Sequence, residues 1–133
     1  MIENQIKDYF SNKKDIVAVY LFGSYARGHN HSRSDVDIAV LFGNPDREVV
    51  NRQIEKIHVE LSRILRKDLH LIALDFAGEL LLKQILKKGR CLIVNDSKSL
   101  AYFTMNALTR IVDFQYYLQK MQSAMTRRGT KGL

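Results

Sequence analysis

The sequence predicts an α/β (α+β) domain in which helices flank one small mixed β-sheet, with a long helix at the C-terminal end. Short apolar runs of strand length alternate along the chain with segments whose apolar residues recur at helical spacing. The connection between the first two expected strands has about thirteen residues, too many for a tight hairpin. Beyond residue 96 one helical segment remains. These features favour helices packed on a single sheet.

The first half of the chain alternates helix and strand. Apolar residues at helical spacing predict a helix over residues 2–11. A run that is rich in β-branched and aromatic residues predicts a strand over 16–22, which ends at a glycine. Residues 24–28 are expected to form a short helix, with a serine near its start and a glycine at its end. A polar loop then leads into a second strand over 36–42.

The middle of the chain is expected to contain a turn, a long helix and a third strand. The turn is Gly-Asn-Pro-Asp, in which Asn44 is expected to cap a helix that has Pro45 at its first position. An apolar stripe at helical spacing continues this helix to about residue 66. The next apolar run, residues 69–74, predicts a third strand.

Two further helices and one strand complete the chain. Residues 80–88 predict a helix that is stopped by Gly89. The apolar run over 91–94 predicts a short fourth strand. A long helix then begins at residue 96 or 97 and is expected to run to about residue 126.

Composition limits the class of protein. The 133 residues are enough for one domain with its own core, and the hydrophobic (46%) and charged (26%) fractions are ordinary for a globular chain. No apolar run approaches the length of a membrane span, and the acidic, polar N-terminus does not resemble a signal peptide. The single cysteine, Cys91, lies in an apolar run, so we expect a small buried core residue and a cytoplasmic protein.

The net charge of +7 arises from 21 lysines and arginines against 14 acidic residues. This charge suits a polyanion such as a nucleoside triphosphate, RNA or an acidic partner. The basic residues are spread out and form no evident platform with interleaved aromatics, so RNA ranks last. The basic residues near the C-terminus are expected to form a solvated tail; they are Lys120, Arg127, Arg128 and Lys131.

Two aspartates stand at the start of the second expected strand, where carboxylates are unusual. Side chains alternate across a strand, so Asp35 and Asp37 point to the same face and repel each other. A divalent cation would relieve that repulsion, and Mg2+ often binds through one or two carboxylates together with substrate phosphates. The ordinary alternative for Asp35 is a surface or turn residue.

Gly23 and Ser24 lie where the first expected strand ends. Glycine lets the backbone come close to a ligand, and the free amides at the start of a helix favour anions. We therefore expect a phosphate cradle at this point. Arg27 and Arg33 lie in the same loop region and can add positive charge for phosphates, although a solvated surface arginine is the more ordinary role.

The phosphate cradle and the aspartate pair together describe attack on the α-phosphate of a nucleoside triphosphate. In such a site two metal ions, about 4 Å apart, activate the nucleophile and stabilise the departing pyrophosphate. Either half alone is commonly an ordinary turn. The joint pattern, Gly-Ser followed after ten residues by Asp-x-Asp with a strand before each, is much more specific.

With these residues the chain resembles a minimal nucleotidyltransferase of the DNA polymerase β-like superfamily. The matching stretches are Gly23-Ser-Tyr-Ala-Arg-Gly28 and Ser34-Asp-Val-Asp-Ile-Ala-Val40, and the resemblance covers residues 16–94. It implies the nucleotidyltransferase fold. It also implies that Gly-Ser binds the triphosphate of ATP and that the two aspartates bind Mg2+.

The family usually has a third carboxylate on the strand that follows. Here the usual position falls on His70, while Asp68 lies two residues earlier on the same face. A small register shift would bring Asp68 into the site, and we assign it the third catalytic and metal-binding role, with His70 as the alternative base. The third acid matters because it can accept the proton of the attacking hydroxyl. Asp75 lies on the opposite face at the far end of the strand.

The smallest members of this family are often antitoxins that work with a helical HEPN-class RNase toxin. The resemblance therefore implies transfer of AMP from ATP to a tyrosine hydroxyl of such a toxin. Two alternatives stay open: an antitoxin that acts by contact alone with a degenerate active site, and a small-molecule (antibiotic) nucleotidyltransferase. The antibiotic-modifying relatives carry a second substrate-binding domain, for which this chain has no room. The sequence leaves the nucleotide and the target residue open.

The C-terminal segment, residues 97–133, is expected to pack on the nucleotidyltransferase core of residues 1–96, on a partner, or on both. Its first apolar stripe alternates steps of four and three: Ala107, Ile111, Phe114, Leu118, Met121 and Met125. A second stripe lies beside it: Met105, Leu108 and Val112. A lone helix with two apolar faces needs a second partner, so we expect a helical partner or a homodimer through 107–125.

Overall fold

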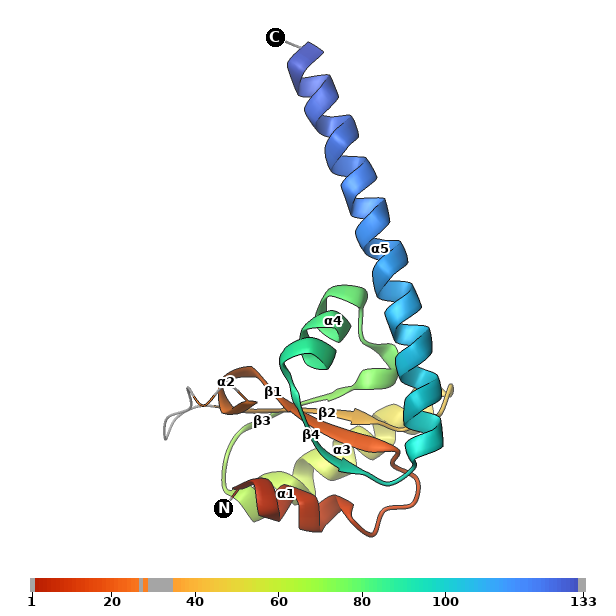
Figure 1. Cartoon of the computed structure of the whole chain (residues 1–133). Helices are drawn as coiled ribbons and strands as arrows, with labels where there is room; N and C mark the ends of the chain where they lie inside the picture. Colours follow the sequence, from red (N-terminus) through yellow and green to blue (C-terminus); the bar gives the residue numbers. More distant parts are fainter. Residues whose placement is uncertain (1, 27, 29–34, 132–133) are drawn as a thin grey trace.

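The computed structural model describes residues 2–26, 28 and 35–131, with side chains described as far as residue 126 (Figure 1). Helices and strands follow the order that the sequence predicts, with one additional short 3₁₀ helix, η1. The elements are α1 (Ile2–Phe10), β1 (Ala18–Phe22), α2 (Gly23–Ala26), β2 (Val36–Leu41), α3 (Arg47–Leu65), β3 (Leu69–Ala73), η1 (Leu74–Phe76), α4 (Glu79–Lys88), β4 (Arg90–Val94) and α5 (Ser97–Lys131).

The four strands form one mixed sheet in the order β3-β2-β1-β4, which confirms the expected fold class. Strand β1 runs antiparallel to both of its neighbours, β2 and β4, whereas β2 and β3 are parallel. All five residues of β1 are buried, because this strand is central and both of its faces are covered. A strand in that position needs apolar side chains on both faces, which explains its uninterrupted apolar run.

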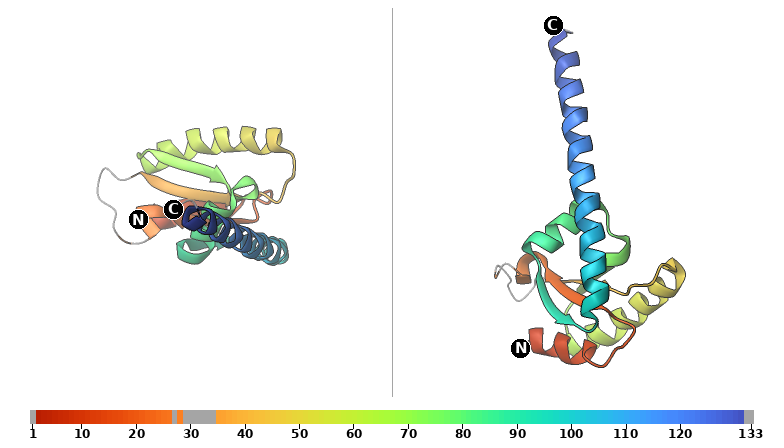
Figure 2. Two further views of the ribbon diagram at one scale, coloured as in Figure 1. Left: turned by 90° about the horizontal axis from the view of Figure 1, so that it is seen from above. Right: turned by 45° about the vertical axis from the view of Figure 1, so that its right-hand side comes forward.

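Helices cover both faces of the sheet. Helices α1 and α3 lie on one face, and α4 together with the first turns of α5 lies on the other (Figures 1 and 2). The α1/α3 face buries side chains such as Phe10 and Leu61 against Leu21 and Ile38. The α4/α5 face is a separate cluster that consists mainly of Ala18, Tyr20, Phe22, Ala39, Leu41, Leu82, Ile85, Ala107 and Ile111.

Helix α3 begins two residues later than the sequence predicts, with Asp46 as its N-cap. The Asp46 carboxylate accepts hydrogen bonds from the amides of Glu48 and Val49 at 3.1 and 3.4 Å. Asn44 does not cap the helix; its side-chain oxygen accepts from the Asp46 amide at 2.9 Å. An aspartate cap also places its charge favourably at the helix N-terminus, so the expectation of Asn44 as the cap and Pro45 as the first helical position was wrong.

Cys91 is exposed, contrary to the expectation of a buried core residue. It lies on β4, which is an edge strand of the sheet. The outer side of an edge strand has no neighbouring strand, so an apolar run there is not evidence of burial.

Helix α5 extends to Lys131, about five residues further than expected. Ala107 and Ile111 are buried against α4, which confirms that part of the first apolar stripe packs on the chain's own core. Beyond them the helix leaves the rest of the molecule (Figure 1). Met125, near its end, is 67% exposed. The side chains of Arg127, Arg128 and Lys131, the predicted basic tail, lie outside the described residues. Within the described part of the chain no helix has the length and apolarity required to cross a bilayer.

Candidate active site

The end of β1 and the start of β2 lie side by side because the two strands are antiparallel. Phe22, the last residue of β1, pairs with Asp37, the second residue of β2. Gly23 and Ser24 follow Phe22 directly and open α2. The fold therefore brings the Gly-Ser turn and the Asp-x-Asp strand together, as the sequence predicts.

Gly23 touches the carboxylate of Asp37. Its φ is +70°, a left-handed conformation that L side chains rarely adopt. A Cβ added to Gly23 would lie 2.1 Å from Asp37 Oδ2. A glycine is thus required for two independent reasons, the backbone conformation and the approach of the carboxylate.

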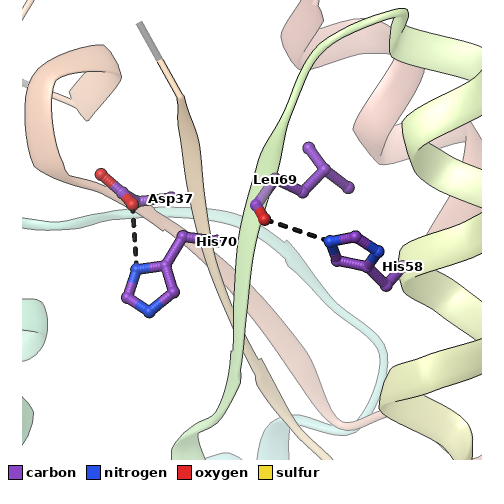
Figure 3. Close-up of polar contacts among 4 residues, drawn as sticks. All are labelled: Asp37, His58, Leu69 and His70. Atoms are coloured by element: carbon purple, nitrogen blue, oxygen red, sulfur yellow. Dashed lines mark hydrogen bonds and ion pairs between the residues drawn. The ribbon is translucent and has the colours of Figure 1, made fainter.

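His70 lies on the other side of the same carboxylate. It pairs with Asp37 in the parallel register of β2 and β3. Its Nδ1 is 3.1 Å from Asp37 Oδ1, and because a carboxylate only accepts, this ring nitrogen donates (Figure 3). The His70 ring also meets the edge of the Phe22 ring, with centroids 6.1 Å apart. The register thus brings His70, where the sequence analysis expected the family's usual third carboxylate to fall, next to Asp37.

The second described histidine, His58, lies on the opposite face of the sheet. Its Nε2 is 3.2 Å from the carbonyl oxygen of Leu69, to which it donates (Figure 3). His58 belongs to α3, and this bond ties α3 to the first residue of β3. It fixes the strand that carries His70 without touching the site.

Asp35 and Asp68 flank the Asp37–His70 pair, at the points where β2 and β3 begin. Both residues are exposed, and each directly precedes its strand. The main chain links the two beginnings, since the Val36 amide donates to the Asp68 carbonyl oxygen at 3.0 Å. No three His, Cys, Asp or Glu side chains among the described residues are grouped closely enough to hold a metal ion. The assignment of Asp68 as the third active-site group therefore stays a prediction.

The residues that are present fit a divalent cation that shares its ligands with a phosphate. Asp37 supplies a carboxylate that is 23% exposed, with one oxygen toward Gly23 and the other toward His70. Oxygen ligands and an open side suit Mg2+, which usually keeps phosphate or water ligands. They do not suit a closed cage of protein ligands, because no third ligand side chain joins them among the described residues.

Positive charge near α2 comes from a residue that the sequence analysis missed. The Lys67 ammonium lies 5.9 Å from the ring centroid of Tyr25, a buried residue of α2. Lys67 stands in the turn between α3 and β3, and no sequence pattern links it to the Gly-Ser motif. Arg27 and Arg33, which were expected to help with phosphates, lie outside the described residues.

Asp75 lies at the opposite end of the sheet and has a structural role. Its two carboxylate oxygens accept from the amides of Phe42 and Gly43 at 2.8 and 2.7 Å. A cleft of about 640 Å³ adjoins it, between the first turns of α5 and the loop after β2. Both features are remote from Asp37, as the position of Asp75 at the far end of the strand implied.

Comparisons with known proteins agree with this geometry. A family model described as "Polymerase beta, Nucleotidyltransferase" matches residues 4–98. The protein adenylyltransferase MntA of Shewanella oneidensis is 33% identical over 89 residues, which make up 66% of this chain. The matched region spans 62% of that relative's length, less than two thirds of it.

Solved structures extend the likeness to nearly the whole chain. A chain in the crystal structure of a toxin–antitoxin with AMP-PNP has a TM-score of 0.71 and 26% identity, and the match covers 96% of this chain and 98% of that one. A complex of tri-AMPylated Shewanella oneidensis HEPN toxin with MNT antitoxin matches in fold, with a TM-score of 0.65 and 24% identity over 95% and 94% of the two chains. The family match includes both the Gly-Ser turn and the Asp-x-Asp strand. The chain therefore belongs to the polymerase β nucleotidyltransferase family.

Proposed function

We propose that this chain is a Mg2+-dependent nucleotidyltransferase that acts as an antitoxin, transferring AMP from ATP to a tyrosine of a HEPN-class RNase toxin. The observation that carries the proposal is the contact of Gly23 with the Asp37 carboxylate, which unites the phosphate-binding turn and the metal-binding strand. The relative MntA is a protein adenylyltransferase, and a similar chain was crystallised in a toxin–antitoxin complex with AMP-PNP.

Each site residue has a role in this proposal. Gly23 and Ser24 bind the triphosphate through the start of α2, while Asp35 and Asp37 hold the metal. Mg2+ at this site, as one or two ions, would neutralise phosphate charge and favour departure of pyrophosphate. The tyrosine oxygen forms a bond to the α-phosphorus as the bond to pyrophosphate breaks. Asp68 accepts the hydroxyl proton in this assignment, because a carboxylate near the nucleophile can act as a general base.

The partner is proposed to dock on the C-terminal segment. We propose that residues 1–96 carry out the transfer and that residues 97–133 hold the toxin. The support is the uncovered part of α5, where large apolar side chains are exposed beyond the core: Val112, Tyr116, Tyr117, Met121 and Met125. Aromatic and methionine side chains are enriched at interfaces. A homodimer along the same face is the competing occupant.

One observation favours a second function, neutralisation of the toxin by contact alone. The position of the usual third acid holds His70, and among the described residues no third ligand joins Asp37 and His70. In this second function the nucleotide site is degenerate, and the exposed surface of α5 is sufficient to neutralise the toxin. Substitutions in the nucleotide site and on the α5 surface distinguish the two functions, since the two features lie in different parts of the chain.

A transfer assay tests the proposal. The chain is purified with its HEPN-class partner, incubated with Mg2+ and each nucleoside triphosphate in turn, and the partner is followed by intact mass spectrometry. The proposal predicts a gain of one or more AMP units with ATP, lost in the Asp35→Asn/Asp37→Asn variant. No gain with any nucleotide, together with a stable complex that Met125→Asp weakens, would establish the contact-only antitoxin instead.

A further inference from the structure

The two oxygens of the Asp37 carboxylate face different neighbours. Oδ2 is turned toward Gly23, where even an added methyl carbon would be 2.1 Å away. Oδ1 is turned toward His70 Nδ1 at 3.1 Å, on the side where the His70 side chain is 59% exposed. A cation that binds Oδ1 from this side therefore lies beside the imidazole.

We propose that His70 is a nitrogen ligand of the metal that Asp37 binds, and that the resulting site prefers Mn2+ to Mg2+. This inference rests on the proposed function and specifies its metal site further. The two side chains proposed to share one ion are then Asp37 and His70; Asp35, which the proposed function also assigns to metal binding, is not grouped with them among the described residues.

The observed spacing agrees with two ligands of one ion. Adjacent ligands of an octahedral ion stand √2 times the metal–ligand distance apart, roughly 3 Å for bonds of about 2.1 Å. The Nδ1–Oδ1 separation of 3.1 Å already matches this edge, so neither strand has to move. An ion bound to both atoms would lie to one side of the line that joins them, so the exposed imidazole ring would turn to aim Nδ1 at it, and the single proton of the neutral ring would then reside on Nε2.

The chemistry of the donors sets the preference. Mg2+ favours an all-oxygen shell, whereas imidazole nitrogen is a better ligand for first-row transition metals. Exchange of one carboxylate for His70 therefore weakens the binding of Mg2+ more than the binding of Mn2+. Because no three ligand side chains converge among the described residues, the ion needs phosphate oxygens as well. Mn2+ is thus expected to bind tightly only together with a nucleotide.

Pulsed EPR of bound Mn2+ provides the direct test. The whole chain, with histidine labelled with ¹⁵N or unlabelled, is mixed with Mn2+ and the α,β-methylene analogue of ATP, which cannot transfer AMP. A nitrogen coordinated to Mn2+ gives a hyperfine modulation that changes with the isotope. The inference predicts this signal for the wild type and for His58→Gln, whose histidine lies on the opposite face, and its loss in His70→Ala.

Affinity measurements complete the test. Calorimetric titration of the analogue in Mn2+ or in Mg2+ is expected to show an affinity for the Mn2+ complex that falls by about tenfold or more in His70→Ala. In His70→Asp the preference for Mn2+ over Mg2+ is expected to shrink or reverse. The substitutions stand at a largely exposed side chain, and a thermal melt verifies that each variant is folded.

The outcomes separate this inference from the proposed function. If the wild type binds the analogue with either metal but shows no isotope-dependent signal, or if His70→Asp keeps the same metal preference, then His70 is not a ligand and the function stands. If the wild type binds no metal–nucleotide complex, the proposed function fails, and this inference fails with it.

Discussion

Replacing Gly23 by alanine would place a methyl carbon against the carboxylate of Asp37. The added Cβ would stand 2.1 Å from Oδ2 and 3.0 Å from the carboxyl carbon. Such contacts do not occur, so the Asp37 side chain must turn away by about 1 Å, since a carbon and an oxygen pack at roughly 3 Å or more. The turn separates Oδ1 from His70 Nδ1, which lie 3.1 Å apart in the wild type.

Part of the stability that Gly23→Ala is expected to lose comes from the backbone conformation alone, and a control variant measures that part. A non-glycine residue in the left-handed region costs roughly 1–2 kcal/mol. Gly28 has a similar φ, +72°, but among the described residues an added Cβ there would meet nothing within 4 Å. Gly28→Ala therefore carries the backbone penalty without the collision and is the matched control.

The two variants should differ most in activity. Displacement of a reacting group by about 1 Å can cost roughly 100-fold in rate. We expect the initial rate of AMP transfer to fall by at least about that factor in Gly23→Ala and to change little in Gly28→Ala. Urea unfolding is expected to show a loss of about 1–2 kcal/mol in Gly28→Ala, and at least as much in Gly23→Ala.

Two results would refute this reasoning. Equal transfer rates for Gly23→Ala and Gly28→Ala would mean that the Asp37 carboxylate does not need its observed position. A Gly23→Ala variant whose stability cost persists undiminished when Asp37 is also changed to alanine would mean that the collision contributes nothing.

Three further predictions, one of them with a control variant, test the fold and the site. Asp37→Asn should abolish transfer, measured by intact mass, without lowering the free energy of unfolding, because the carboxylate is partly exposed and a repelling charge is removed; a destabilised variant would contradict this. Ile111→Ala should lower the free energy of unfolding in urea by about 2–4 kcal/mol, since Ile111 is 6% exposed, whereas Met125→Ala, at 67% exposed, should change it by less than about 0.5 kcal/mol. A hydrogen bond from its own amide and the Arg110 guanidinium lower the pKa of Glu79. The charged carboxylate therefore stabilises the fold above the pKa of the unfolded chain, and this stabilisation is lost as the pH falls through the pKa of the folded protein. The melting temperature of Glu79→Gln should therefore lie below that of the wild type at neutral pH and converge with it toward about pH 3; a constant difference would contradict the assignment.

The sequence was informative where one local pattern has a single structural solution. Gly23 and Asp37 could be placed together because a strand end, a glycine and an aspartate pair occur at a spacing that few turns share. The stop of α4 at Gly89 was predicted for a similar reason. Local propensity and the tertiary structure agree at these positions.

Other features depend on contacts that the sequence does not display. The cap of α3 falls on Asp46, because Asn44 and Asp46 compete for the same amides and only the folded turn decides between them. The exposure of Cys91 follows from the edge position of β4, which depends on strand order. The pairing of His70 with Asp37 depends on the register of β3, which an alternating apolar pattern fixes only to within two residues.

Attack at the α-phosphate is the central claim, and the fate of each phosphate tests it most directly. The chain and its HEPN-class partner are incubated with Mg2+ and ATP that is labelled at either the α-phosphate or the γ-phosphate. Label from the α-phosphate should appear on the partner, and label from the γ-phosphate should leave as pyrophosphate. Neither the transfer nor the release should occur in the Asp35→Asn/Asp37→Asn variant. Transfer of the γ-label to the partner, or no transfer of either label by a complex that binds ATP, would contradict the account.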